Sequence, residues 1–131
     1  MQLKEIDVDF SSDKVEKKLK SLEGGCFEEI NLFRHLSKAI DELKINPVAG
    51  VKMQHRLWPK QCRSLDLDNL YKYDLPNGWR LIYTIKNQGV RLLAVIIEWL
   101  SHKAYEKRFK YLVRDLPRYT YGPVSNLLYC T

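Results

Sequence analysis

The chain has 131 residues, with 22 Lys and Arg against 16 Asp and Glu, and 45% of its residues are hydrophobic. This length supports one compact domain, and so much apolar surface excludes a chain that is disordered throughout. The longest apolar run, Leu92 to Ile97, is the length of a strand, whereas a membrane span needs about 18 residues. The first residues also lack the apolar stretch of a signal peptide. We therefore expect a globular protein that neither spans a membrane nor is secreted.

The cysteines Cys26, Cys62 and Cys130 are odd in number and widely spaced. A disulfide framework is typically even-numbered and dense, so this pattern favours a reducing, cytoplasmic location. No second cysteine stands at the spacing of a metal-binding pair. We expect neither a metal nor another cofactor.

Positive charge is concentrated in the C-terminal two-thirds of the chain. The net charge is −3 over residues 1–30, +1 over residues 31–47 and +8 over residues 48–131, where Tyr and Trp are interleaved with Lys and Arg. Lys and Arg bind nucleic acids by releasing phosphate counterions, and aromatic rings stack on bases. The pattern therefore indicates a nucleic-acid surface. A solvated basic surface and a face for an acidic protein partner are the alternatives.

The first 47 residues predict one strand and two helices. Imperfect apolar alternation predicts a strand over residues 3–10. Asp13 and Glu16 form a helix-starting box, and apolar residues on one face predict a helix to about residue 22, ended by the glycines that follow. A second helix is predicted from residue 27 to about residue 43, with Asn46-Pro47 as its stop.

The pattern then becomes extended. Alternation over residues 51–58 predicts a strand with Lys52 and Arg56 on one face and His55 on the other, followed by a polar loop over residues 60–68. Further strands are predicted from residue 70 to 75, from 79 to 85 and from 90 to 100, with turns at 76–78 and 87–89. The last strand contains the longest apolar run of the chain, as is typical of a strand buried on both faces at the centre of a sheet.

Ser101 is a good N-cap for a final helix from His102 to about residue 113. The element order predicts an α+β fold, with a twisted, mostly antiparallel sheet of about four to five strands packed on the two N-terminal helices, and a C-terminal helix. We place this domain at residues 1–116 and an extended C-terminal tail at residues 117–131.

Two motifs are more specific than the rest. Residues 71–83 form a hairpin that ends in Gly-Trp-Arg-Leu-Ile-Tyr, and residues 94–105 form an apolar strand that ends in His-Lys-Ala-Tyr. This combination resembles the RelE/ParE toxin superfamily, and the His102–Tyr105 ending is most similar to its RelE-like and HigB-like branches. The resemblance covers residues from about 3 to 112.

Members of this superfamily are small toxins that pair with an acidic antitoxin. RelE-like members cut messenger RNA in the ribosomal A site, whereas ParE-like members inhibit DNA gyrase. The resemblance therefore implies a ribosome-dependent mRNA endoribonuclease whose partners are an acidic antitoxin, the ribosome with its mRNA, and operator DNA through the antitoxin complex.

RNA cleavage by the 2′-hydroxyl needs a base, positive charge on the phosphate and an acid for the leaving 5′-oxygen. We expect Arg80 to hold the phosphate, with a salt bridge to Asp74 as the structural alternative. His102 has the chemistry of an acid or base, unless it is a second N-cap or a surface histidine. Tyr105 shares a face with His102, where it either contacts the RNA or packs under the sheet.

Glu98 is a further candidate base, although a carboxylate that ends a buried strand equally suits a pair with Arg80 or Arg91. Basic residues on the same part of the chain are the expected substrate contacts: Lys52, His55, Arg56, Lys72, Lys103 and Arg108.

Two other functions fit the same residues. One is a non-catalytic member of the same fold, either a gyrase-inhibiting toxin or a protein that binds its antitoxin and operator DNA. The other is an unrelated basic RNA-binding module whose aromatic residues stack on bases without cleavage.

Overall fold

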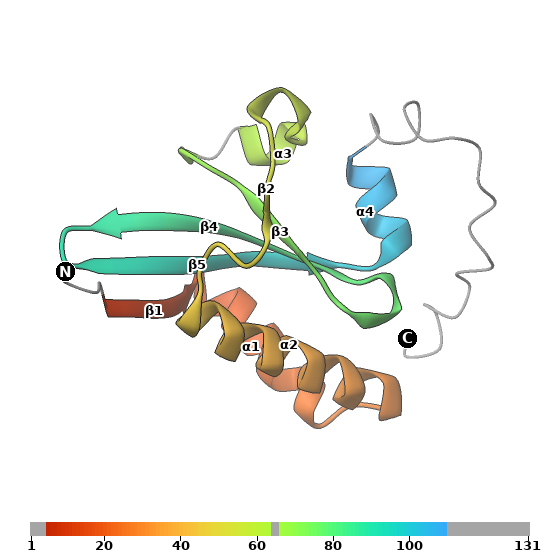
Figure 1. The fold of residues 1–131 in the computed structure, drawn as a ribbon. Helices are drawn as coiled ribbons and strands as arrows, with labels where there is room; N and C mark the ends of the chain where they lie inside the picture. The colour runs from red at the N-terminus through yellow and green to blue at the C-terminus, as the bar shows by residue number, and fades with distance from the viewer. Residues whose placement is uncertain (1–4, 64–65, 110–131) are drawn as a thin grey trace.

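The structure is a computed structural model that describes residues 5–63 and 66–109. The fold is α+β, with a five-stranded mixed sheet in the order β1-β5-β4-β3-β2 (Figure 1). The parallel pairing joins β1 to β5, and the other neighbouring strands are antiparallel. The strands are β1 (Glu5–Phe10), β2 (Val51–Lys52), β3 (Tyr71–Asp74), β4 (Arg80–Gln88) and β5 (Arg91–Leu100). The expected mostly antiparallel sheet is confirmed, whereas the proposed tail at 117–131 lies outside the described residues.

Helices α1 (Asp13–Glu23) and α2 (Phe27–Ile45) pack on one face of the sheet (Figure 1). The Ser12 hydroxyl caps α1 by accepting a hydrogen bond from the backbone of Val15, and Gly24 ends the helix. Apolar side chains at helical spacing are thereby turned towards the strands. The core on this side is formed by Leu19, Leu22, Leu32, Leu36, Ala39, Leu43, Leu75, Leu81, Tyr83, Ala94, Ile96 and Trp99.

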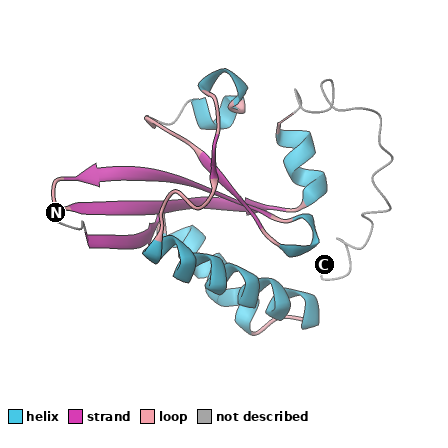
Figure 2. Cartoon of the chain, in the orientation of Figure 1, coloured by secondary structure: helices cyan, strands magenta, loops and turns pink. Residues whose placement is uncertain are grey.

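The other face carries a second core and shorter helical segments (Figure 2). These segments are a 3₁₀ turn at His55–Leu57, α3 (Lys60–Arg63) and α4 (His102–Arg108). The buried side chains on this side are Met53, Trp58, Cys62, Leu70, Ile82, Leu100, Tyr105 and Phe109. The sheet is thus covered on both faces, and α4 begins where β5 ends.

The prediction of one strand over residues 51–58 is wrong, because only Val51 and Lys52 form a strand. β2 ends at Lys52, and residues 55–57 form a 3₁₀ turn in which the backbone of Trp58 donates to the carbonyl of His55 at 3.1 Å. The rule of alternating faces therefore does not apply to His55 or Arg56. The polar loop predicted next also begins with a helical turn, α3, because burial of Cys62 anchors it to the second core.

β5 contains a bulge at Ile97. Ile82 pairs with Glu98 while its neighbour Tyr83 pairs with Ile96, so Ile97 is an extra residue in the ladder. Ile96 faces α1 and α2, and Ile82 lies in the second core. The bulge therefore puts Glu98 on the α4 face, opposite to Ile96, although the two residues are only two positions apart.

Two further observations concern location. Cys26 is disulfide-bonded, whereas Cys62 is a buried free thiol. Within the described residues, none of the helices has the length and apolar character needed to cross a bilayer.

Candidate functional site

Two cations on neighbouring strands meet at one carboxylate. Asp74 and Arg80 are cross-strand partners on β3 and β4. Asp74 Oδ1 lies 2.9 Å from Arg80 Nε and 3.1 Å from Lys72 Nζ. The contact with Arg80 Nε is an ion pair without the alignment of a hydrogen bond. The structural alternative expected for Arg80 is therefore present, and it also includes Lys72.

The ring of Tyr105 supports both cations from α4. Its centroid lies 5.4 Å from Arg80 Cζ and 5.9 Å from Lys72 Nζ, within the range of cation–π attraction. Tyr105 is buried and stacks on Phe109 at 4.5 Å. Its ring therefore packs under the sheet, where it holds the two cations in place, and does not offer an open face to an RNA base. We call Lys72, Asp74, Arg80 and Tyr105 the cation site.

His102 occupies the first position of α4, where the Ser101 hydroxyl caps the helix by accepting from the backbone of Ala104 at 3.1 Å. Its Nε2 atom is buried and lies 2.9 Å from Glu106 Oε1, one helical turn away. The Nδ1 side of the ring lies beside Gly78, in the β3–β4 turn. The two sides of the ring therefore face different groups, Nε2 towards Glu106 and Nδ1 towards Gly78.

Gly78 allows this turn to approach α4. Its φ is +81°, and a Cβ there would lie 2.8 Å from the Cβ of His102.

Gly78→Ala is expected to reduce the free energy of unfolding by about 1–2 kcal/mol through backbone strain, and by about 1–3 kcal/mol more through overpacking. Urea denaturation with Gly89→Ala as control separates the two effects, because Gly89 has φ +71° and open space around it. Equal losses in both variants would contradict the close approach.

Glu98 belongs to a separate pair on the same face. Its carboxylate lies 2.8 Å from the guanidinium of Arg108 on α4. The structural alternative expected for Glu98, a pair with Arg80 or Arg91, is therefore replaced by a pair with Arg108. Arg91 instead contacts Glu5 and Asp7 at the far edge of the sheet. Burial raises the pKa of the neighbouring Cys62 thiol to about 11, with a further rise from Glu98 and an opposing effect of Arg108.

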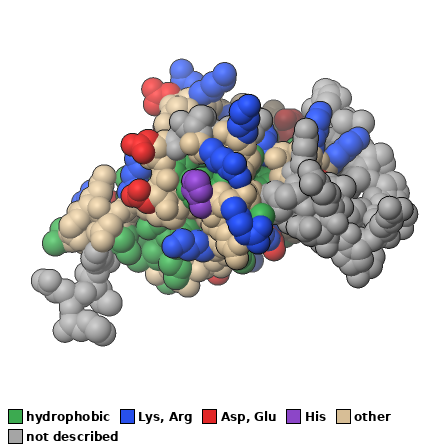
Figure 3. Space-filling view, turned by 90° about the horizontal axis from the view of Figure 1, so that it is seen from above, with side chains coloured by type: hydrophobic (Ala, Val, Ile, Leu, Met, Phe, Trp, Pro, Cys, Tyr) green, Lys and Arg blue, Asp and Glu red, His purple; other side chains and the backbone are tan. Residues whose placement is uncertain are grey.

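The other expected substrate contacts surround these pairs. Lys52, His55, Arg56 and Lys103 are exposed, and Lys and Arg side chains gather around a histidine in the middle of the face seen in Figure 3. The ring of His55 packs on Trp58 at 4.6 Å. Sequence reasoning missed Lys60 and Arg63 on α3, since both fall in a segment that it treated as loop. In the sequence, these two residues are marked only by their positive charge.

Each of the inner cations contacts a carboxylate of the protein itself. Among the described residues, Lys72 and Arg80 share Asp74, Arg108 binds Glu98, and His102 contacts Glu106. The exposed cations around them are outside these pairs. An anion would therefore be attracted by the outer cations and would reach the inner ones only in competition with a carboxylate.

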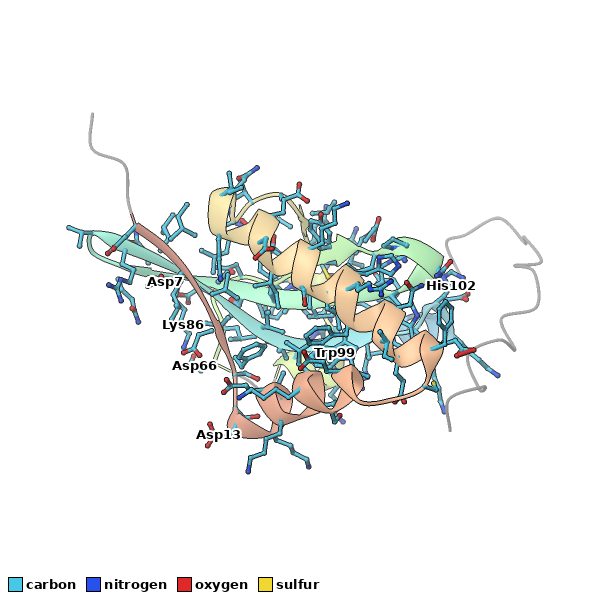
Figure 4. The ribbon with its side chains drawn as sticks, turned by 90° about the horizontal axis from the view of Figure 1, so that it is seen from below. Asp7, Asp13, Asp66, Lys86, Trp99 and His102 are labelled. Carbon is cyan, nitrogen blue, oxygen red and sulfur yellow. The ribbon has the colours of Figure 1, made fainter. Side chains whose placement is uncertain are left out.

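The described surface also has a hollow of about 460 Å³ at the other end of β4, lined in part by Asp66, Asp68, Thr84 and Lys86. Asp66 and Lys86 lie at the opposite end of the molecule from His102 (Figure 4). With one cation beside two carboxylates, the hollow is poorly suited to phosphate. Within the described part of the chain, no three His, Cys, Asp or Glu side chains are grouped to hold a metal ion.

Comparisons of the sequence and structure with known proteins add no relative to this description. No family model, no curated protein and no solved structure matches the chain.

Proposed function

We propose that the chain binds single-stranded RNA through the cation site and cleaves it, as a ribosome-dependent mRNA endoribonuclease toxin of the RelE/ParE type. The observation that carries this proposal is the convergence of Lys72 and Arg80 on one anionic oxygen above Tyr105. A phosphate oxygen at the position of Asp74 Oδ1 would meet both cations. Arg80 would add the two parallel hydrogen bonds that guanidinium makes with phosphate.

The exposed basic residues extend this site to a longer strand. Lys52, Arg56 and Lys60 are exposed on the segment from β2 to α3, and β2 is next to β3 in the sheet order. Cations in such a row follow a phosphate backbone, and the resulting affinity decreases with salt. The same surface charge suits an acidic antitoxin and the phosphates of a ribosome, which we propose as the partners.

Cleavage requires two proton transfers. The 2′-oxygen attacks the adjacent phosphorus as a base removes its proton, and the bond to the 5′-oxygen breaks as an acid protonates that oxygen, leaving a cyclic phosphate. His102 and Glu98 are the candidates at this end of the sheet. Glu106 lies beside Nε2 of His102, and Arg80 would stabilise the charge that develops on the phosphate.

A second candidate function is binding without cleavage. It is favoured by the contacts of both candidate acid–base groups, since Nε2 of His102 is buried against Glu106 and Glu98 is held by Arg108. In that case the cation site would serve RNA, operator DNA or the gyrase–DNA complex as a binding surface only.

Primer extension on a message in a translation extract tests the proposal. We expect new cuts within translated codons when the full chain is added, and none with His102→Ala or Arg80→Ala. An intact message with translation blocked would favour binding without cleavage. An intact message with normal translation would contradict both functions on RNA and turn attention to gyrase.

A further inference from the structure

A carboxylate already occupies the place that the proposed function assigns to phosphate. Asp74 Oδ1 contacts both Lys72 Nζ and Arg80 Nε, and both cations lie over the ring of Tyr105. We propose that Asp74 is a displaceable internal anion, which pairs with the two cations in the free protein and leaves them when an RNA phosphate binds. The inference rests on the proposed function and identifies a residue that sets the affinity of its site.

The three side chains differ in how firmly they are held. The side chain of Asp74 is 57% exposed, whereas those of Lys72 and Arg80 are 23% and 19% exposed. Asp74 is the last residue of β3, next to the turn, while the two cations lie against the Tyr105 ring of α4. The carboxylate therefore has room to rotate into water without disturbing the core. The cations stay in place over Tyr105.

The exchange is energetically reasonable. The Asp74 side of these ion pairs is open to water, and solvent-screened pairs contribute about 0–1 kcal/mol, so little is lost when Asp74 leaves. A phosphate diester offers Arg80 two charge-assisted hydrogen bonds and Lys72 a third. Any other anion that binds this site, including the carboxylate of an acidic side chain, would likewise have to displace Asp74.

The test measures binding of the full chain to a fluorescent single-stranded RNA whose 2′-O-methyl riboses prevent cleavage. Asp74→Asn is expected to raise the affinity about two- to fivefold at low salt, and to steepen the slope of log K against log salt by about 0.7. Asp41→Asn is the matched control, because Asp41 is exposed on α2, across the sheet. Asp74→Ser is a second neutral variant, and the gain should vanish when Arg80→Ala is combined with Asp74→Asn.

Three results would overturn the inference. If both neutral variants bind RNA no more tightly than the wild type while Arg80→Ala weakens binding, Asp74 only positions the cations and the proposed function stands. If Asp41→Asn gives the same gain, or the gain survives Arg80→Ala, the effect is one of overall charge. If the wild type binds no RNA at all, the proposed function and the inference fail together.

Discussion

Replacing Arg80 by alanine is expected to lower the rate of RNA cleavage about 10²–10³-fold, the usual cost of removing one donor that stabilises transition-state charge. The side chain has two roles in the proposed site, since it attracts the phosphate and fixes its orientation. The loss of one phosphate contact should also reduce the salt slope of RNA binding by about 0.7. Folding should change little, because the ion pair of Arg80 with Asp74 is partly exposed.

Arg80→Lys separates the two roles. It keeps the charge, so the salt slope should match that of the wild type, but it loses the planar fork and should still cleave poorly. Arg34→Ala on α2 is the control for net charge, because Arg34 is exposed and α2 covers the opposite face of the sheet. Wild-type cleavage by Arg80→Ala would remove the cation site from the mechanism.

Tyr83→Phe is expected to reduce the free energy of unfolding by about 1–3 kcal/mol, the cost of leaving buried polar groups without a partner. The Tyr83 hydroxyl donates to the carbonyl of Pro47 at 2.7 Å and accepts from the backbone of Gly50 at 3.0 Å. It thereby joins β4 to the loop between α2 and β2. Urea denaturation of Tyr71→Phe is the comparison, because Tyr71 stacks on Tyr83 but is only half-buried. Equal losses would contradict this role of the hydroxyl.

Tyr83 and Tyr73 predict a loss of stability at alkaline pH. Burial raises the pKa of Tyr83 from 10.0 to about 12, and burial with the nearby Glu42 raises that of Tyr73 to about 12. A raised pKa means that the folded state holds the proton more tightly, so the stabilisation is complete below pH 10 and is lost as the pH rises through about 12. The urea midpoint should therefore fall over this range, and less steeply in Tyr83→Phe. A midpoint that does not change between pH 10 and 12 would contradict these pKa values.

The helices and turns could be predicted because their signals are local. Ser12 and Ser101 cap α1 and α4 through hydrogen bonds three residues away, and Gly78 supplies the left-handed backbone of the predicted turn. Such contacts depend on a few neighbouring residues and are visible in the sequence. The structure of residues 51–58 could not be predicted in this way. Their apolar alternation is compatible with a strand, but packing of Trp58 in the second core selects a 3₁₀ turn.

The candidate site could be predicted only in part, since its members are brought together by pairing across strands. The sequence indicated Arg80, Tyr105 and the pairing with Asp74. It did not indicate that Lys72 would share this carboxylate, which depends on the register of β3 against β4. Nor did it indicate the side of the sheet on which Glu98 lies, because the bulge at Ile97 has no glycine or other local signal.

The central claim is that the cation site holds an RNA phosphate, and nuclear magnetic resonance tests it most directly. The Nε–H signal of Arg80 would be followed while a non-cleavable single-stranded RNA is added to the full chain. The account predicts a saturable shift of this signal, accompanied by the side-chain signals of Lys72 and Asp74. Saturable shifts confined to other residues, with the Arg80 signal unchanged, would place the RNA elsewhere and contradict the account.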